Sequence, residues 1–347
     1  MRGLLVGAGY ISRRHLAAWR RVGGVEIVGV CDVVRKRAEE RAREFGIGAV
    51  FCDAGEALAK LKPEFVDIAT GPEAHLPLAR LAAQAGAHML VQKPLAPSIE
   101  EARAIAEAAR AGGVRARVLE MWRYLPEWQT LARVLGEKPV GEAYFVRLSG
   151  RGGLRRSAPV NENQPYFKDM PRLLVYEMWV HYLDCLRWLF GEVEKVFAVG
   201  RRVNRMLRGE DFAQAMLLFR SGAVCCIDHS WAHEPQSGLQ EPLRVRVEGP
   251  EGRVEMCEGG RMVEVRRAGE GQRRIPVERG PEPFVEAMAA CQRDFIEGLR
   301  AGREFESTIE DNIRTLSVAF AIYQSMEEER AVCVEELAAR GGSSPTR

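Results

Sequence analysis

The chain opens with a short apolar segment that runs directly into closely spaced glycines and then into a helical pattern. Residues 3–6 predict a buried strand, Gly7 and Gly9 follow it, and residues 15–21 have helical periodicity. In this context Gly7 permits a tight turn, and Gly9 lets the backbone approach a pyrophosphate at the N-terminus of the helix. Ser12 stands where a third glycine is usual and is small enough for close packing. The segment therefore predicts the dinucleotide-binding turn of a Rossmann fold.

The next strand pattern, residues 26–31, ends at an acidic residue, Asp32. A carboxylate about twenty positions after the glycines accepts the adenosine ribose hydroxyls and repels a 2′-phosphate, which favours NAD as the cofactor. Arg35 and Arg37 follow closely and could pair with such a phosphate, so NADP stays open. The plainer alternative is that Asp32 only caps its loop.

Strand and helix patterns alternate along the rest of the first 121 residues. The expected strands lie at 49–52, 65–70, 88–92 and 115–121, and the expected helices lie at 54–61, 75–85 and from Ser98 onward. Ser98 and Glu101 form a capping box that marks the start of that last helix. Such alternation predicts right-handed βαβ units and a doubly wound parallel sheet. We therefore expect residues 1–121 to form an α/β Rossmann dinucleotide-binding domain.

The strand pattern at residues 88–92 leads into Lys93, and Pro94 follows at once. Pro94 has no N–H and cannot continue a strand ladder, so the chain must turn away there. Ligands of open parallel sheets bind beyond the carboxyl ends of the strands. Lys93 and the neighbouring turn at Thr70 and Gly71 are therefore expected along the cofactor crevice. The alternative is an ordinary surface lysine at a strand end.

The pattern changes at Trp122, and residues 122–335 predict an α+β domain. Strand patterns lie at 142–148, 193–203, 213–219, 223–230, 243–248, 253–257 and 262–266, and helix patterns lie at 127–135, 173–190, 284–300 and 308–328. The consecutive strands predict a mostly antiparallel sheet. We expect residues 336–347 to be a frayed tail.

Residues 150–172 have no periodic pattern, and irregular segments of this length inside a compact domain tend to be functional or disordered. Gln164 and Tyr166, with the polar run 161–164, suit the binding of a hydroxylated ligand. The segment also carries five basic residues: Arg151, Arg155, Arg156, Lys168 and Arg172. These charges form either a solvated face or a site for a carboxylated or phosphorylated substrate.

The pattern at residues 173–190 is apolar almost all round, which predicts a buried helix. Its polar exceptions include Glu177, His181 and Asp184. At about 100° per residue of an α-helix these three positions fall within one narrow stripe. Buried ionisable groups are costly unless paired, and neighbours perturb one another's pKa. The stripe is therefore either a catalytic cluster or a satisfied structural one.

Composition excludes several classes of function. A length of 347 residues favours two domains, and a net charge of +2 gives no electrostatic case for nucleic acid or a membrane surface. No apolar run approaches membrane-spanning length, and the first strand leaves no room for a signal peptide. The eight cysteines contain no CxxC pair, so reduced thiols and a cytoplasmic location are expected.

One apparent metal motif, Cys225, His229 and His233, does not have a usable spacing. On a strand these residues share a face, but steps of four residues separate them by about 13 Å each. A single metal ion cannot bridge that distance, so we expect no metal site.

With these residues in hand, the chain resembles the Gfo/Idh/MocA oxidoreductase family over nearly its whole length. The matching motifs are Gly7-x-Gly9 with His15, Ala69-Thr70-Gly71-Pro72 with His75, Gln92-Lys93-Pro94, Trp122-Arg123-Tyr124-x-Pro126, and Glu177 to His181 followed by Asp184. The resemblance implies a Rossmann domain, a C-terminal domain with a large open sheet that is often used for oligomer contacts, and hydride transfer at a sugar or polyol carbon. A homodimer or homotetramer is then expected.

Two departures from the family pattern concern the candidate site. Gln92 stands where the family commonly has Glu, and Glu177 stands where it commonly has Asp. Within the family, the chain is most similar to the D-apiose dehydrogenase branch in the combination of four segments: Gln92-Lys93-Pro94, Gln164-Pro165-Tyr166, Arg202-Val-Asn204 and Gly209-Glu-Asp211.

The resemblance implies roles for individual residues. As catalytic residues, His181 takes the hydroxyl proton, Lys93 donates to the developing alkoxide, and Glu177 orients His181 or holds a neighbouring hydroxyl. The expected cofactor-binding residues are Gly7, Gly9, Tyr10, Ile11, Asp32, Arg37, Thr70, Gly71, His75, Gln92 and Lys93. The expected substrate-binding residues are Lys93, Trp122, Arg123, Gln164, Tyr166, Glu177, His181 and Asp184.

Two other functions remain open at this point. An NAD-dependent glycosidase would use the same fold with transient oxidation of the sugar and no net NADH. A cofactor-sensing regulatory protein would bind the dinucleotide and turn nothing over.

Overall fold

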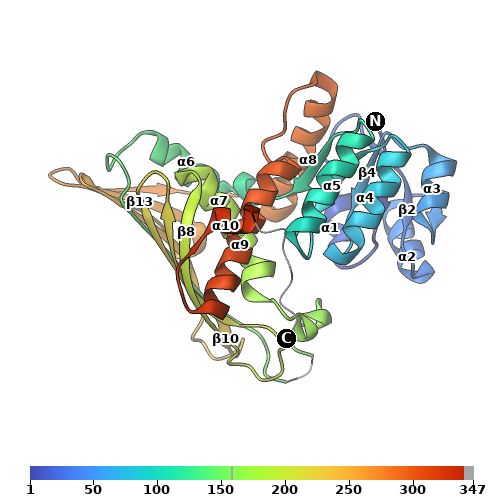
Figure 1. Ribbon diagram of the computed structural model, residues 1–347. Coiled ribbons are helices and arrows are strands. Elements are labelled where there is room, and N and C mark those ends of the chain that lie inside the picture. The colour runs from blue at the N-terminus through green and yellow to red at the C-terminus, as the bar shows by residue number, and fades with distance from the viewer. Residues whose placement is uncertain (158, 340–347) are drawn as a thin grey trace. The chain divides into compact units, whose positions relative to one another are not determined.

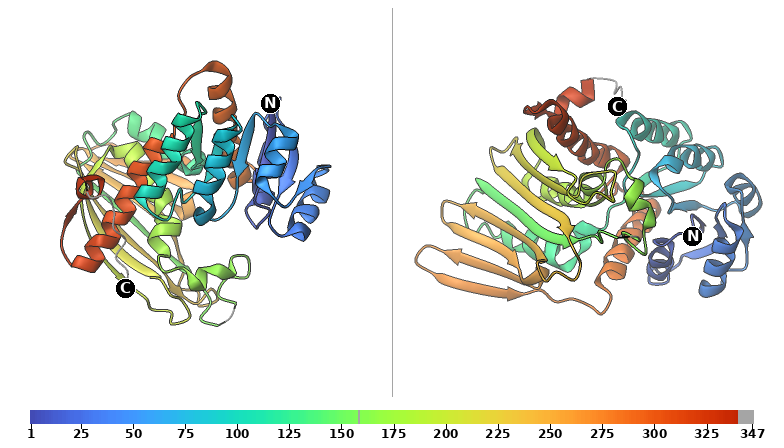
Figure 2. Two further views of the ribbon diagram at one scale, coloured as in Figure 1. Left: turned by 45° about the vertical axis from the view of Figure 1, so that its right-hand side comes forward. Right: turned by 90° about the horizontal axis from the view of Figure 1, so that it is seen from below.

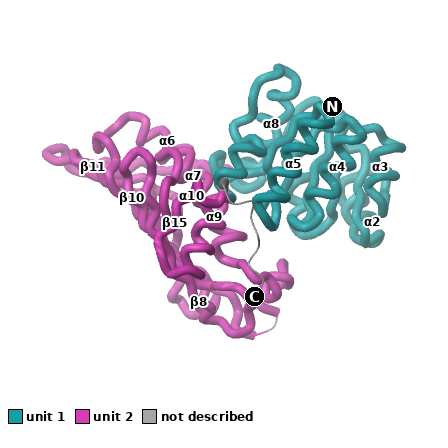
Figure 3. Tube along the Cα trace, viewed as in Figure 1, with its two compact units in different colours: residues 1–124, 281–316, 342–347 teal, residues 125–280, 317–341 magenta. Residues whose placement is uncertain are grey.

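A computed structural model describes residues 1–157 and 159–339, which divide into two compact units (Figure 3). The first unit contains Met1–Tyr124 and Pro281–Leu316, and the second contains Leu125–Gly280 and residues 317–339. The chain thus returns to the first unit late in the sequence, a feature that the expected linear division at residues 121 and 335 does not contain. Of the expected tail, residues 336–339 lie in a short helix, and residues 340–347 lie outside the described part.

The first unit is built on a six-stranded sheet with the order β3-β2-β1-β4-β5-β6, and all its strand pairs are parallel. Its strands are β1 (Arg2–Val6), β2 (Glu26–Cys31), β3 (Val50–Phe51), β4 (Phe65–Ile68), β5 (His88–Gln92) and β6 (Ala116–Leu119). The strand order reverses between β1 and β4, which is where a doubly wound sheet binds its ligand. The predicted Rossmann architecture is confirmed.

Helices cover both faces of this sheet. They are α1 (Ser12–Trp19), α2 (Arg35–Phe45), α3 (Ala54–Leu61), α4 (His75–Gln84), α5 (Ile99–Ala111) and α8 (Pro283–Ala301), with short 3₁₀ turns at Pro72–Ala74 and Trp122–Tyr124. Helices α3, α4 and α5 pack side by side (Figure 1), while α1 contacts α2 and α8. Leu4, Leu5, Leu90 and Val91 are fully buried, as expected for strands covered on both sides. The predicted capping box is confirmed: the Ser98 side chain accepts from the Glu101 N–H.

The second unit contains a nine-stranded sheet with the order β14-β13-β12-β11-β7-β10-β9-β8-β15 (Figure 2). Its strands are β7 (Phe145–Gly153), β8 (Val193–Arg201), β9 (Phe212–Phe219), β10 (Val224–His233), β11 (Glu241–Gly249), β12 (Gly252–Cys257), β13 (Met262–Arg267), β14 (Gly271–Pro276) and β15 (Val332–Cys333). Every pairing is antiparallel except that of β7 with β10, so the predicted mostly antiparallel sheet is confirmed. Strands β14 and β15 were not expected.

The helical elements of the second unit are α6 (Pro126–Gly136), a 3₁₀ turn at Pro165–Asp169, η4 (Leu174–Trp179), α7 (Val180–Phe190), a 3₁₀ turn at Glu258–Gly260 and α10 (Val334–Ala339). Helix α9 (Ile309–Glu328) continues from the first unit, and the boundary falls between Leu316 and Ser317. No helix in the described part of the chain is long and apolar enough to cross a membrane.

The expectation of one α-helix over residues 173–190 was wrong in its first half. Residues Leu174–Trp179 form a π-helix, and the α-helix begins only at Val180. A π-helix has wider turns than an α-helix because its hydrogen bonds join residues five apart. The stripe calculated at about 100° per residue therefore does not describe the relation of Glu177 to His181, although it holds for His181 and Asp184, which both lie in α7.

Candidate active site

The glycine loop after β1 has the features that a pyrophosphate requires. Gly7 has a φ of +99°, and a Cβ at this position would lie 2.6 Å from the carbonyl oxygen of Ala69, so no other residue fits without strain. A Cβ at Gly9 would meet no protein atom within 4 Å. At the adjacent strand end, the Thr70 hydroxyl is buried without a hydrogen-bond partner among the described residues. An open approach at Gly9 and an unsatisfied hydroxyl nearby fit a bound dinucleotide.

Asp32 supports this loop from the end of β2. Its Oδ2 accepts from the Ala8 N–H at 2.7 Å, and its Oδ1 accepts from the Val34 N–H at 2.8 Å. The carboxylate is only 9% exposed. Asp32 therefore does cap its loop, and its binding of the adenosine ribose stays a prediction.

Ser12 is joined to an arginine that sequence reasoning did not identify. The Ser12 hydroxyl donates to the Gly9 carbonyl at 2.6 Å and accepts from Arg41 Nε at 3.0 Å. Arg41 also approaches the Gly9 carbonyl and pairs with Glu44. A cation beside the glycine loop adds to the positive potential at the start of α1.

His75 joins the turn after β4 to the segment that follows Lys93. Its Nδ1 lies 2.9 Å from the Leu95 carbonyl, and its Nε2 lies 3.1 Å from the Thr70 carbonyl. The ring is fully buried, and burial lowers the pKa of His75. His75 therefore holds the backbone of these two segments, and its cofactor-binding role stays a prediction.

Lys93 follows β5 directly, is half-buried, and precedes a cis peptide bond to Pro94. Its backbone N–H donates to Gln92 Oε1 at 2.7 Å. Gln92 in turn contacts His15 Nε2 at 3.0 Å, and His15 Nδ1 lies 2.9 Å from the Asp67 carboxylate. The sequence signal for the contacts of His15, Asp67 and Gln92 was Asp67, an aspartate in the middle of a fully buried strand. That signal was not used in the sequence analysis.

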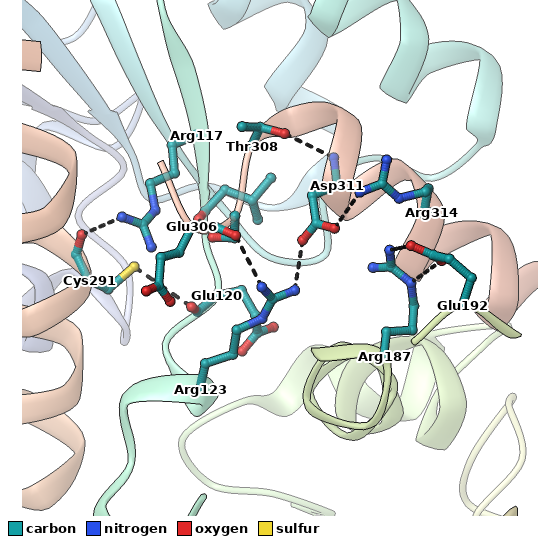
Figure 4. Close-up of polar contacts among 12 residues, drawn as sticks. Arg117, Glu120, Arg123, Arg187, Glu192, Cys291, Glu306, Thr308, Asp311 and Arg314 are labelled. Atoms are coloured by element: carbon teal, nitrogen blue, oxygen red, sulfur yellow. Dashed lines mark hydrogen bonds and ion pairs between the residues drawn. The ribbon is translucent and has the colours of Figure 1, made fainter. Parts of the chain in front are cut away.

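Trp122 and Arg123 follow β6 and differ in their surroundings. Arg123 is 5% exposed and donates to the Glu306 carbonyl at 3.0 Å and to Asp311 at 2.7 Å (Figure 4). These contacts give Arg123 a structural role in the first unit. Trp122 is half-buried and meets the ring of Phe284 edge-on, with centroids 6.5 Å apart.

An exposed aromatic residue, Tyr10, lies in the glycine loop. Tyr10 is 43% exposed, and its hydroxyl accepts from Arg14 Nη2 at 3.0 Å. The Arg14 guanidinium also lies 5.8 Å from the ring centroid of Phe284, which is 42% exposed. Trp122, Phe284, Arg14 and Tyr10 therefore form a continuous series of contacts in the first unit. Ile11, at the same loop, precedes the first residue of α1.

In the second unit, Glu177 is half-buried in the π-helix, while His181 is 6% exposed and Asp184 is fully buried in α7. The π-helix is held at its start by Glu210, whose carboxylate accepts from the Leu173 and Val175 N–H groups at 3.2 and 2.9 Å. The Lys93 group and the His181 group therefore belong to different compact units.

The irregular segment contains an ordered polar pair. Gln164 Nε2 donates to the Tyr166 hydroxyl at 2.8 Å, and Tyr166 is 52% exposed. The neighbouring Phe167 is buried and stacks on Trp231 with an interplanar angle of 9°. The exposed Tyr166 thus lies against a buried aromatic base, and the role of Gln164 and Tyr166 in substrate binding stays a prediction.

Among the described residues, Cys257, Glu258 and Glu264 offer ligand atoms within 4.8 Å of one another. Arg274 pairs with both of these glutamates.

His229 from the rejected motif is 5% exposed, and its Nδ1 accepts from Trp179 Nε1 at 3.2 Å.

Comparisons with known proteins cover nearly the whole chain. Residues 1–120 match an oxidoreductase family with an NAD-binding Rossmann fold, and residues 128–255 match the GFO/IDH/MocA C-terminal domain. A D-apiose dehydrogenase from Paraburkholderia graminis is 34% identical, covering 97% of this chain and 91% of that protein. A D-apiose dehydrogenase from Rhizobium rhizogenes is 28% identical, covering 96% and 97%. An oxidoreductase from Agrobacterium radiobacter, solved with NAD⁺, L-tartaric acid and magnesium, has a TM-score of 0.89 at 27% identity, covering 97% and 99%.

Proposed function

The chain belongs to the GFO/IDH/MocA oxidoreductase family, and from this premise we propose that it oxidises a D-apiose-like aldose to its lactone, with NAD as the cofactor. The observation that carries the proposal is the nearly full-length similarity to D-apiose dehydrogenases, together with a lysine at the carboxyl end of β5 in the same parallel sheet as a loop suited to a pyrophosphate. The NAD-dependent sugar dehydrogenase is favoured over the glycosidase and the cofactor-sensing regulator.

The residues that would hold the dinucleotide are those of the first unit. The loop from Gly7 to Ile11 would face the pyrophosphate, Asp32 would meet the adenosine ribose, and Thr70 would offer its unsatisfied hydroxyl. Gly71 and His75 shape the same strand end. Arg37 is exposed at the start of α2, where it would meet a 2′-phosphate if NADP bound instead.

Bound NAD supplies an acceptor for the hydride that leaves the hydroxyl-bearing carbon of the sugar. His181 takes the proton of that hydroxyl as general base, a role for which histidine is suited near neutral pH. The Lys93 ammonium donates to the oxygen as negative charge develops on it and then to the carbonyl oxygen of the lactone. Atoms balance, because the carbon loses a hydride, the oxygen loses a proton, and a C=O bond forms.

The remaining residues position the sugar. Glu177 accepts from a neighbouring hydroxyl of the sugar or orients His181. Asp184, which lies in α7 with His181, is a further candidate for the substrate site. Gln164 and Tyr166 offer a polar pair for other hydroxyls, and Trp122 offers an apolar face. We leave Arg123 out of the substrate set, because it is buried and donates to Glu306 and Asp311 within the first unit.

The test is a screen of pentoses, hexoses, polyols and their acids for reduction of NAD, with NADP in parallel. We expect D-apiose to give net formation of reduced nicotinamide. Lys93→Ala should lower kcat/KM on the order of 100- to 1,000-fold, as loss of an oxyanion donor does, and His181→Ala should lower it on the order of 100-fold or more. Lys60→Ala, which removes an exposed lysine paired with Glu56 on α3, is the matched control.

Two outcomes would contradict the proposal. Release of an aglycone from glycosides without net reduced nicotinamide would favour the glycosidase. Binding of NAD with no turnover of any sugar would favour the regulator. Retention of wild-type turnover in Lys93→Ala would remove the assigned role of that residue.

The assembly proposed for this protein is a homodimer or homotetramer formed through the sheet of the second unit. Phe197 on β8 and Met216 on β9 are paired in register and are 45% and 52% exposed. Adjacent exposed apolar side chains on a sheet mark an interaction surface. Light scattering of the wild type and of Met216→Lys would test this, with a single monomeric mass for the wild type as the contradicting result.

The proposed location is the cytoplasm. The eight cysteines, all of them among the described residues, are free, which suits a reducing compartment. Fractionation of cells that express the protein is the direct measurement.

A further inference from the structure

A continuous buried hydrogen-bond chain runs through the first unit and ends at the backbone of Lys93. Asp67 on β4 accepts from Trp19 Nε1 at 2.6 Å and meets His15 Nδ1 at 2.9 Å. His15 Nε2 lies 3.0 Å from Gln92 Nε2, and Gln92 Oε1 accepts from the Lys93 N–H at 2.7 Å. His15 and Asp67 are fully buried, and Gln92 is 6% exposed. Water therefore has little access to any member of the chain.

The donor and acceptor pattern fixes the form of each group. The Lys93 N–H can only donate, so it must meet the oxygen of the Gln92 amide, and the amide nitrogen must then face His15. An amide nitrogen also only donates, so His15 Nε2 must offer its lone pair. The single ring proton then lies on Nδ1 and is donated to the Asp67 carboxylate. His15 is therefore neutral, and its tautomer follows from both of its partners.

We propose that Gln92 is a positioning residue for the proposed reaction and that His15 and Asp67 hold its amide in the one orientation that supports the Lys93 backbone. The inference rests on the proposed function, because the role of Lys93 comes from there. Lys93 is the first residue after β5, so the orientation of its peptide decides where its ammonium is delivered. A displacement of about 1 Å at such a point can cost on the order of 100-fold in rate.

These hydrogen bonds also make the identity of residue 92 and the protonation of His15 depend on each other. A glutamate at position 92 could still accept from the Lys93 N–H through one oxygen. Its other oxygen would need a donor from His15 Nε2, and His15 would then carry protons on both nitrogens between two carboxylates. The wild-type protein therefore combines Gln92 with a neutral His15. In Gln92→Glu, His15 should become an imidazolium, while the Lys93 N–H keeps an acceptor at residue 92.

The first test reads the histidine directly. In protein labelled with ¹⁵N at histidine, NMR should show that His15 of the wild type is protonated at Nδ1 only. In Gln92→Glu at the same neutral pH, it should show both nitrogens protonated. The chain has six histidines, and single substitutions of the other five assign the His15 signal even if a His15 variant does not fold. A proton on Nε2 in the wild type, or an unchanged His15 in Gln92→Glu, would overturn the proposal.

The second test separates positioning from a general structural role. Gln92→Met keeps the size of the side chain and removes both hydrogen bonds, so kcat should fall on the order of 100-fold. The dissociation constant of NAD, measured by calorimetry, should stay within about threefold, because the Gln92 amide contacts His15 and the Lys93 N–H in place of the cofactor contact expected from the sequence. Gln92→Glu should restore kcat to within about tenfold of the wild type, because the Lys93 N–H regains its acceptor. His88→Gln, at the opposite end of β5, is the matched control and should leave kcat and NAD binding unchanged.

The results distinguish this inference from the function on which it rests. If Lys93→Ala loses turnover but Gln92→Met does not, only the positioning role is overturned. If Gln92→Met weakens NAD binding as much as it lowers kcat, Gln92 supports the cofactor site in general and the proposal is likewise overturned. If Lys93→Ala retains turnover, the role assigned to Lys93 fails and the positioning role of Gln92 fails with it, whatever the NMR shows. The proposed function itself fails only if no sugar gives net reduced nicotinamide.

Discussion

At the scale of single residues, burial and hydrogen-bond partners decide what a histidine in this protein can do. His229 on β10 is a clear case, because it belongs to the apparent metal motif with Cys225 that was considered and rejected in the sequence analysis. Its Nδ1 accepts from the Trp179 indole N–H at 3.2 Å, and its ring packs edge-on against Tyr182. A ring that must accept a hydrogen bond in an apolar environment is held neutral.

This environment predicts a pH-dependent contribution to stability. Burial, with a further effect of the Arg151 charge, lowers the pKa of His229 to about 4 from 6.5. As the pH falls, the unfolded chain binds the proton first, so the contribution is complete above about 6.5 and is lost as the pH falls toward 4. The full loss is about 3 kcal/mol, of which about 2 kcal/mol falls between about pH 7 and about pH 5.

His229→Gln tests this prediction, because glutamine does not titrate but can still accept from Trp179. We expect the decrease in the free energy of unfolding between about pH 7 and about pH 5 to be about 2 kcal/mol smaller in the variant. Urea denaturation, followed by tryptophan fluorescence, measures it. An identical pH dependence in the two proteins would show that His229 keeps an ordinary pKa.

At the scale of elements, the sequence predicted most of the helices and strands but not the π-helix. Apolar periodicity located α8, α9 and the central strands of both sheets, because those elements bury a regular face. The π-helix at Leu174–Trp179 depends instead on side chains far away in the chain. Glu210 accepts from N–H groups at its start, and the Tyr323 hydroxyl accepts from the Tyr176 N–H at 3.1 Å. No local pattern in residues 173–190 could have indicated these partners.

The same contacts predict which substitution loosens the π-helix. Tyr323 also donates to Glu210 Oε1 at 2.6 Å, so Tyr323→Phe removes an acceptor of the Tyr176 N–H and one donor to a buried carboxylate. We expect a loss of about 1–3 kcal/mol of stability, together with faster hydrogen exchange at the Tyr176 amide. Turnover should fall as well, because Glu177 lies in this segment.

Hydrogen exchange with mass spectrometry on segment 173–190 measures the effect. Tyr144→Phe is the matched control, since Tyr144 is 55% exposed and its hydroxyl lies 3.5 Å from Glu248. Equal exchange in the two variants would show that Tyr323 does not hold the π-helix.

At the scale of the whole molecule, the first unit is completed by residues from late in the sequence. The sequence predicted a domain of residues 1–121, because the βαβ pattern ends there. The edge strand β6 is nevertheless engaged by the returning segment. Arg117, fully buried on β6, donates to the Cys291 carbonyl at 3.0 Å (Figure 4). Arg117 also pairs with Asp294, and Ser307 donates to the Val118 carbonyl. A pattern of local periodicity cannot show which distant segment covers an edge.

The returning segment also completes the hydrophobic core of the first unit. Phe65 on β4 is fully buried between Trp19 and Phe295, whose ring centroids lie 4.9 and 5.8 Å away. Gln292 on α8 donates to the His15 carbonyl at 3.2 Å. Without α8, a chain of residues 1–124 would expose Phe65 and would lose the carbonyl and carboxylate partners of Arg117. An uncovered core is strongly destabilising.

We therefore predict that residues 1–124, expressed alone, do not unfold cooperatively and show weak near-UV circular dichroism. A peptide of residues 281–316 added in trans should restore a sigmoidal urea transition, because it supplies both Phe295 and Asp294. A peptide of the same composition in scrambled order is the control, since it adds the same charge and apolar content without the register. If residues 1–124 alone gave a cooperative transition that the peptide did not shift, the first 121 residues would be an autonomous domain and α8 only an accessory to it.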